Sequence, residues 1–274
     1  VNIESNDQDF RRDFFEKNYV ETVVNFSALK KTDKGRGKQL FVSSVWPASV
    51  FIYSPSFPER PNSAILYCIP KPKASDSALP GIVIDASEIK FLPREKCATS
   101  DIIWKVAMWA TQRDFELIEK LRNTKTLEEY IKPERGWYWA RGLQKPGTSG
   151  EFEDKEIAKL KKIPTRSVGR YWLDEDKLKI IGKKYFDRTG NKRTYYAPHV
   201  LLKRGPSKNK LCAIFANFDC AFNDSIYGIA TSNKDELRLK ALTAYLNSSF
   251  VSYFLFLTAS MWGIERPRIS ESEL

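Results

Sequence analysis

Lysines and arginines alternate with aromatic residues between positions 135 and 210, and these residues are the ones best suited to chemistry. Lysine and arginine neutralise phosphates, and arginine also binds guanine through two parallel hydrogen bonds. Residues 131–210 hold 21 Lys or Arg against 9 Asp or Glu, a net of +12, which leaves −1 for the rest of a chain whose total is +11. Such segregation is typical of a polyanion-binding protein. A solvated basic face that keeps the protein soluble fits the composition equally well.

We predict that part of this basic zone contacts nucleic acid. Residues 190–193 are expected at the tip of a hairpin centred on 188–191, a shape that fits a groove. A second basic loop, KGRGK at 34–38, is expected either to touch a nucleic-acid backbone or to be solvated. The predicted contact residues are Arg141, Lys145, Arg166, Arg170, Lys183, Lys184, Arg188, Lys192, Arg193, Tyr195, Lys203 and Arg204.

Other reactive residues give weaker patterns. Asp85, Glu88 and Lys90 resemble the carboxylates and lysine of a metal-dependent nuclease, but such sites need acidic groups from two elements, and this spacing is common by chance. His199 lies beside a proline and an apolar run without acidic or cysteine neighbours at ligand spacing, which favours a structural role. The four cysteines are far apart and form no CxxC pair, so we expect reduced, mostly buried thiols.

The secondary-structure elements that must position these residues follow two different patterns along the chain. Before residue 132 we expect a helix within 6–19, a buried strand at 20–26, and a hairpin of strands 48–53 and 64–69. A broken strand at 81–91 and helices between 100 and 131 follow. From residue 137 the pattern changes to short strands and turns, including strands at 211–218 and 221–230. A long amphipathic helix is expected within 240–268, with its start near Asp235 and a bend or tight packing point at 247–249.

Several segments resemble the target-recognition region of adenine-N6 DNA methyltransferases from restriction-modification systems. They are YYAPHVLLKRG (195–205), CAIFANFDCAFNDSIYGI (212–229) and LTAYLNSSFVSYFLFLTASMWGIERP (242–267), in the order expected of that region. VVNFSAL and PASVFIYSP resemble strands that complete the catalytic domain of the same family. The glycine-rich turn that receives S-adenosylmethionine and the Asn/Asp-Pro-Pro-Tyr/Phe motif are absent. The resemblance therefore implies the C-terminal portion of a longer methyltransferase.

This resemblance implies an α+β (mixed α/β) fold. A partial methyltransferase-type sheet (1–80) would precede a connecting strand and helical bridge (81–134), and a mainly β target-recognition domain with a long C-terminal helix (135–274) would follow. The implied partners are double-stranded DNA and a specificity or restriction subunit. S-adenosylmethionine would be the cofactor of the full-length protein, with no cofactor, catalytic residue or metal in this chain. A domain that only docks on a specificity subunit remains an alternative.

Composition bears on location as well. The first 20 residues carry charges throughout, so we expect no signal peptide. The most apolar run, Phe250 to Leu257, is far shorter than the roughly 20 residues that cross a bilayer. We therefore expect a cytoplasmic protein that does not bind a membrane.

Overall fold

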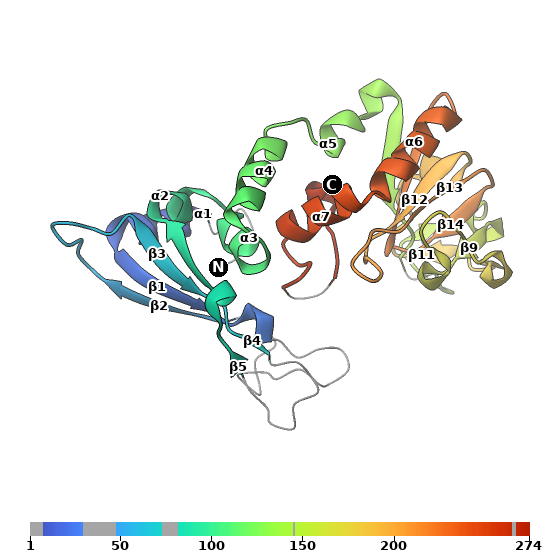
Figure 1. The fold of residues 1–274 in the computed structure, drawn as a ribbon. Coiled ribbons are helices and arrows are strands. Elements are labelled where there is room, and N and C mark those ends of the chain that lie inside the picture. Colours follow the sequence, from blue (N-terminus) through green and yellow to red (C-terminus); the bar gives the residue numbers. More distant parts are fainter. Residues whose placement is uncertain (1–7, 30–47, 73–81, 145, 265–266) are drawn as a thin grey trace. The chain divides into compact units, whose positions relative to one another are not determined.

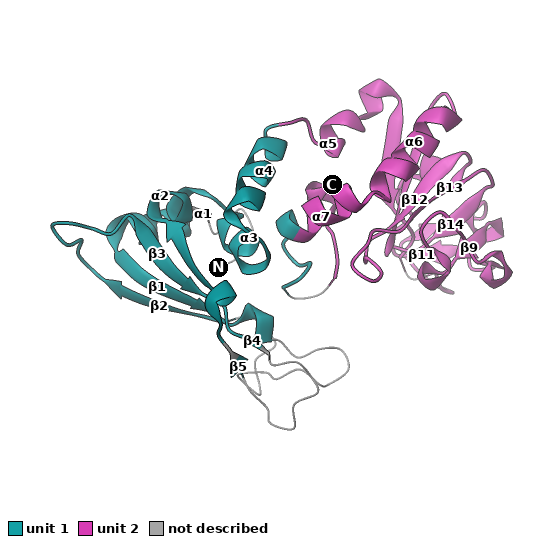
Figure 2. Cartoon of the chain, in the orientation of Figure 1, with its two compact units in different colours: residues 1–123, 257–266 teal, residues 124–256, 267–274 magenta. Residues whose placement is uncertain are grey.

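The computed structural model describes residues 8–29, 48–72, 82–144, 146–264 and 267–274. These residues form helices and mostly antiparallel sheets, which confirms the α+β prediction. Figure 2 shows the division of the chain into two compact units. Unit 1 comprises residues 1–123 and 257–266, and unit 2 comprises residues 124–256 and 267–274.

A four-stranded mixed sheet forms the centre of unit 1 (Figure 1). Its spatial order is β2-β1-β3-β6, with β1 and β3 parallel and the outer pairs antiparallel. The strands are β1 (Tyr19–Asn25), β2 (Ser49–Ser54), β3 (Ala64–Cys68) and β6 (Ile89–Pro93), and a separate short ladder joins β4 (Lys71–Pro72) to β5 (Ile82–Val83). The strand expected at 20–26 is thus confirmed as β1.

The hairpin expected from residues 48–53 and 64–69 is wrong, although both segments are strands. They are β2 and β3, and β1 lies between them in the sheet. The apolar pattern of a strand indicates which face is buried but not which strand lies beside it. The connection 55–63 exceeds the two to five residues usual in hairpins and is long enough to pass β1.

One face of this sheet carries the core of unit 1. Tyr67 of β3 is fully buried, and its hydroxyl donates to the Trp104 carbonyl oxygen at 3.0 Å and accepts from the Asn25 amide at 2.6 Å. The Trp104 ring also packs against the rings of Tyr67 and Phe15, with centroids 5.3 Å and 5.5 Å apart. The Tyr67 hydroxyl therefore has a partner both as donor and as acceptor, so its burial leaves no polar group of this side chain unpaired.

Among the described residues, the opposite face of the sheet is mostly apolar and is exposed at its two edges. Pairing aligns two rows across the four strands, Val50–Val24–Cys68–Ile89 and Ile52–Thr22–Leu66–Phe91. At the ends of these rows Val50 is 48%, Ile52 53%, Ile89 43% and Phe91 73% exposed. The ends of both rows are therefore exposed to solvent, and a contiguous exposed apolar patch of this kind often marks a contact surface.

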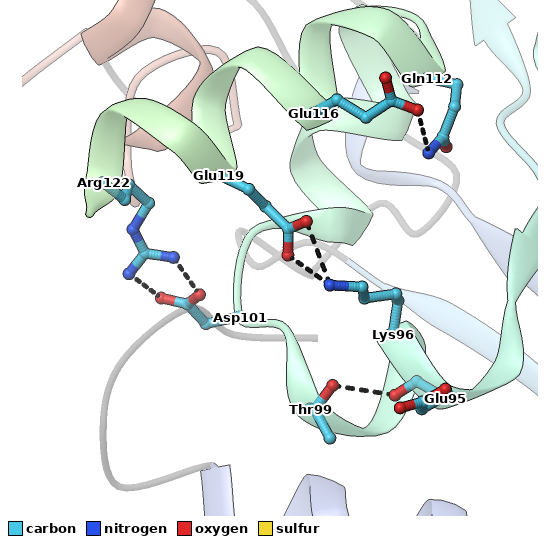
Figure 3. Close-up of polar contacts among 8 residues, drawn as sticks. All are labelled: Glu95, Lys96, Thr99, Asp101, Gln112, Glu116, Glu119 and Arg122. Carbon is cyan, nitrogen blue, oxygen red and sulfur yellow. Dashed lines mark hydrogen bonds and ion pairs between the residues drawn. The ribbon is translucent and has the colours of Figure 1, made fainter. Parts of the chain in front are cut away.

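Helices α1 (Gln8–Lys17), α2 (Arg94–Thr99), α3 (Ile103–Trp109) and α4 (Gln112–Arg122) complete unit 1. The helical prediction for 100–131 is confirmed as separate helices, because Thr111 starts a new capping box with Asp114 at the end of α3. Ion pairs connect α4 to the preceding residues. Lys96 lies 2.9 Å from Glu119, and Arg122 binds Asp101 through two hydrogen bonds of 2.5 Å and 2.8 Å (Figure 3).

Unit 2 is built on a second four-stranded sheet, in the order β13-β12-β15-β7, with every pair antiparallel. Two smaller sheets accompany it, β10-β9-β14 and β11-β8. The bounds are α5 (Leu127–Tyr130), β7 (Trp137–Arg141), β8 (Phe152–Glu153), β9 (Lys161–Ile163), β10 (Lys179–Ile180), β11 (Tyr185–Phe186), β12 (His199–Lys203), β13 (Ala213–Ala216), β14 (Cys220–Phe222) and β15 (Ile226–Thr231).

The single strand expected at 221–230 is in fact two strands in different sheets. β14 pairs in parallel with β9, whereas β15 pairs with β12 and β7. Asn223 and Asp224 make the turn between them, and the Asn223 carboxamide oxygen accepts from the Ser225 N–H at 3.3 Å and from the Thr165 hydroxyl at 2.9 Å. Such local side-chain hydrogen bonds compete with a continuous strand.

The long C-terminal helix expected within 240–268, with its start near Asp235, is divided into α6 (Glu236–Leu246) and α7 (Ser249–Thr258). Asn247 is fully buried at the break; its Oδ1 accepts from the Ala213 N–H at 3.0 Å and its Nδ2 donates to the Ala213 oxygen at 2.8 Å. The predicted bend and packing point at Asn247 are confirmed, and one continuous helix is wrong. The Asn247 side chain thus hydrogen-bonds to both the N–H and the oxygen of Ala213 on edge strand β13, as the backbone of a neighbouring strand would.

No helix among the described residues is both long enough and apolar enough to cross a bilayer.

Candidate nucleic-acid interface

The nuclease-like residues of unit 1 take structural roles. The Asp85 and Glu88 side chains form a capping box around the 3-10 turn Ala86–Glu88. Glu88 is buried and pairs with Lys71 at 3.1 Å, while the Lys90 ammonium donates to the Ala110 carbonyl oxygen, and burial lowers the pKa of Lys90. The described part of the chain holds no group of three or more His, Cys, Asp or Glu residues that could bind a metal ion.

The cysteines and the histidine are likewise internal. All four thiols are free; Cys97, Cys212 and Cys220 are buried, and burial raises the pKa of Cys97 to about 12. His199 is fully buried, with Nδ1 2.7 Å from the Thr194 oxygen and Nε2 3.3 Å from the Cys220 sulfur. The structural role predicted for His199 is confirmed, since both ring nitrogens have partners inside the core.

We expect acid to destabilise the protein through this imidazole. Burial lowers the pKa of His199, whereas the unfolded chain binds the proton near pH 6.5. Stability is therefore fully present above about pH 6.5 and falls below it by at most about 1.4 kcal/mol per pH unit. Because the chain has one histidine, a single imidazole NMR signal reports the titration, and it should keep its neutral shift at pH 6. A signal that titrates at or above pH 6.5 would contradict the burial argument.

The surplus of positive charge belongs to unit 2. This unit holds 26 Lys or Arg and 17 Asp or Glu, a net of +9, whereas unit 1 holds 19 and 17, a net of +2. Together the units give the total of +11. The asymmetry makes unit 2 the candidate polyanion-binding unit.

Four of the residues predicted to contact nucleic acid are instead built into the fold of unit 2. Tyr195 is fully buried, its hydroxyl donates to the Thr189 carbonyl oxygen, and burial raises its pKa. Arg204 is 6% exposed, donates to the Asp224 oxygen at 3.0 Å and stacks on Tyr227 at 5.3 Å. We therefore remove Tyr195 and Arg204 from the candidate surface.

The other two bind backbone oxygens. Arg170 Nη2 donates to the Asn247 oxygen at 2.5 Å, and Arg188 Nη2 donates to the Gly142 oxygen at 3.5 Å. In both side chains Nε is buried without a hydrogen-bond partner in the described structure. These guanidinium groups position the chain around them, so a role in positioning replaces the predicted direct contact.

Three further predicted residues face carboxylates. Lys184 pairs with Glu153 at 3.1 Å, Lys192 pairs with Asp154, and Arg141 lies 3.8 Å from Glu271. The Arg141 and Lys184 pairs are solvent-exposed, so each contributes little to stability and can exchange its carboxylate for a phosphate. Asp154 differs because it is buried and its Oδ1 accepts two backbone N–H groups, which fix it in place.

The remaining predicted residues are the most available. Arg166 and Lys183 are exposed and have no ion-pair or hydrogen-bond partner for their side chains among the described residues. Arg193 is exposed with its guanidinium 4.3 Å above the Tyr138 ring, and Lys203 donates to the Ser207 hydroxyl at 2.9 Å. Lys145 and the loop 34–38 lie outside the described residues.

The hairpin expected at 188–191 is wrong, and the basic hairpin tip lies elsewhere. β11 pairs with β8, and Asn191 caps the 3-10 helix Lys192–Tyr195. Asparagine suits a helix cap as well as a turn, which explains the error. The connection between β12 and β13 instead narrows to a two-residue turn of Lys208 and Asn209, with φ of 49° and 57°. Positive φ at both positions is the geometry of a tight hairpin turn.

Sequence reasoning missed two features of this surface. One is the exposed tip 208–210, for which the signal was the Lys-Asn pair between apolar strands. The other is Arg268, whose charge, with that of Arg141, adds to burial in lowering the pKa of Arg204. The segment that carries Arg268 is fixed to the sheet by the Ile269 N–H, which donates to the Arg204 oxygen at 3.0 Å. No local pattern could place residue 268 beside 204.

The fold and charge define an α+β protein with a strongly basic, mainly β second unit. No family model matches the chain, and no curated protein matches it.

Proposed function

We propose that this chain is the target-recognition part of an adenine-N6 DNA methyltransferase of a restriction-modification system, and that unit 2 binds duplex DNA. The observation that carries the proposal is the net charge of +9 on unit 2, against +2 on unit 1. Arg166, Lys183 and Lys208 supply exposed cations that need not break an internal ion pair. Each phosphate that they neutralise releases condensed counterions, which drives binding.

The exposed apolar face of unit 1 supports the first half of the proposal, that this chain belongs to a larger methyltransferase. Its apolar rows have exposed ends at Val50, Ile52, Ile89 and Phe91, and contiguous exposed apolar side chains of this kind suit a packed contact with another domain. We infer that a catalytic domain of the same methyltransferase covers them. That domain would bind S-adenosylmethionine and accept an adenine flipped out of the duplex. The whole protein would act in the cytoplasm, with a specificity or restriction subunit as a further partner.

The mechanism assigned to this chain is recognition without catalysis. Phosphate contacts from lysines and arginines set the register of the protein on the duplex and carry no sequence information. Exposed arginines such as Arg166 and Arg193 are suited to bind base edges, because a guanidinium can pair with guanine through two hydrogen bonds.

The salt dependence of duplex binding tests the proposal. Fluorescence anisotropy of a labelled 30-bp duplex between 50 and 200 mM NaCl should give a linear rise of log Kd with log salt. The slope should equal about 0.9 for each phosphate contacted. Replacing Arg166 and Lys183 by glutamine should reduce that slope by about one unit for each contact removed.

The matched control replaces Arg113 and Lys120 of α4 by glutamine, because they are an exposed arginine and lysine of unit 1. This variant should keep the slope of the unchanged chain. Absence of duplex binding at 50 mM NaCl, or binding that does not depend on salt, would overturn the proposal. If the chain does not bind DNA but binds a specificity subunit with an affinity that does not depend on salt, the alternative of a domain that only docks on such a subunit would be supported.

A further inference from the structure

The turn Gly169–Trp172 in unit 2 presents two adjacent aromatic side chains to solvent. The Val168/Leu173 bridge closes the turn, and the Gly169 N–H donates to the Trp172 oxygen at 3.0 Å. Tyr171 is 60% exposed and Trp172 is 57% exposed. Tyr171 also has φ of 66°, a left-handed conformation that costs a residue with a side chain about 1–2 kcal/mol. A strained residue with an exposed ring suggests a role outside the fold.

Several contacts fix the backbone of this turn while the rings stay outside. The Tyr171 N–H donates to the Ala213 oxygen at 3.1 Å, and Arg170 donates to the Asn247 oxygen at 2.5 Å. The Trp172 indole lies against Gly169 so closely that a Cβ on Gly169 would come 2.2 Å from its Nε1. The turn is therefore preorganised, which reduces the entropy that a contact with a ligand would cost.

One guanidinium lies beside the Tyr171 ring, and two further exposed cations lie within three residues, along the chain, of the turn or of its contact residue Ala213. Arg166 is exposed three residues before Gly169, and the Arg170 guanidinium lies 6.0 Å from the Tyr171 ring. Lys210, at the exposed hairpin tip, comes three residues before Ala213, whose oxygen accepts from the Tyr171 N–H, and the two are separated by at most roughly 10 Å of extended chain. Exposed rings with exposed basic residues nearby along the chain suit a nucleotide, since the rings stack on a base while Arg166 or Lys210 faces its phosphate.

We propose that the Tyr171–Trp172 turn stacks on nucleobases that are unpaired or unstacked in bound DNA. The inference rests on the proposed function, because it assumes that unit 2 binds DNA. It adds that the unit recognises an opened base and not only the duplex backbone. A base lifted out of the stack would meet a rigid aromatic surface already held in place by Ala213 and Asn247.

The test compares a 30-bp duplex with the same duplex carrying a two-nucleotide gap in one strand. The unchanged chain should bind the gapped DNA about 10-fold more tightly, within the range measured for one aromatic–base stack. Trp172→Leu should abolish that preference and Trp172→Phe should retain it, since phenylalanine still stacks. 2-Aminopurine opposite the gap should lose fluorescence on binding of the unchanged chain and of Trp172→Phe, but not of Trp172→Leu.

Two further variants complete the design. Phe152→Leu changes an exposed ring elsewhere in unit 2, 48% exposed, and should leave the preference unchanged. Tyr171→Ala keeps the backbone contact with Ala213, removes the second ring and should lower the preference. If Trp172→Leu and Tyr171→Ala keep both the preference and the quenching while salt-dependent duplex binding persists, this inference fails and the proposed function stands. If the unchanged chain binds neither DNA at low salt, the proposed function itself fails.

Discussion

Replacing Asn247 by alanine should lower the free energy of unfolding by about 3 to 4 kcal/mol. The carboxamide is fully buried and makes both hydrogen bonds to the Ala213 backbone, 3.0 Å to its N–H and 2.8 Å to its oxygen. Alanine would leave the Ala213 N–H without an acceptor and a cavity at the junction of α6 and α7. Urea unfolding followed by circular dichroism measures the loss.

The matched control for this variant is Asn233→Ala. Asn233 is exposed in the turn before α6, so its truncation should change stability by less than about 0.5 kcal/mol. Equal losses for the two variants would show that Asn247 does not hold β13 to the helices. Asn247 also accepts from Arg170 through its main-chain oxygen, which alanine preserves, so the turn that carries Tyr171 should keep that anchor.

Replacing Gly142 by alanine should cost about 3 kcal/mol or prevent folding of unit 2. An added Cβ would come 2.1 Å from the Phe222 oxygen and 2.6 Å from the Asn223 oxygen, and these backbone atoms cannot rotate away as a side chain could. The same Phe222 oxygen accepts from the Leu143 N–H at 2.7 Å, so the clash would also disturb this hydrogen bond between β14 and the chain after β7. The same unfolding measurement applies.

Gly182→Ala separates steric overlap from backbone conformation. Gly182 has φ of 64°, but an added Cβ there would meet nothing within 4 Å. Its replacement should cost only the left-handed strain, about 1 kcal/mol. If Gly142→Ala were no more destabilising than Gly182→Ala, the close approach at Phe222 would not matter for stability.

Local patterns predicted elements well because their causes are local. The apolar, β-branched residues around Val23 and the aromatic segment at Trp137 predicted strands where β1 and β7 form, and the polar residues near Asn247 predicted a bend where α6 ends. The same patterns did not predict which strands pair with each other. β1 lies between β2 and β3, and β14 pairs with β9 although β15 follows it directly in the sequence. Strand pairing depends on contacts between segments far apart in the chain, which local patterns do not contain.

The sequence indicated which region of the chain carries the positive charge, but not which side chains of that region are exposed. Its charge was visible in the sequence, but Arg170, Arg188 and Arg204 donate to main-chain oxygens that no spacing rule associates with them. A long guanidinium side chain can be buried against distant backbone or remain in solvent, and composition does not distinguish the two. Tyr195 illustrates the same point for aromatics, since its ring lies in the core.

Both compact units contain residues from the last eighteen of this sequence, 257–266 in unit 1 and 267–274 in unit 2. Lys105 of α3 donates to the Ala259 oxygen, and Tyr227 of β15 donates to the Ile269 oxygen at 3.4 Å. Protein synthesis adds about 5–20 residues per second. Unit 1 can form its contacts with residues 257–266, and unit 2 its contacts with residues 267–274, only after those residues have left the ribosome. The ribosome must therefore translate Ala259 before unit 1 can complete its contacts, and Ile269 before unit 2 can complete its own. Unit 1 thus cannot complete its fold before most of unit 2 has been synthesised, unlike an N-terminal domain that folds independently.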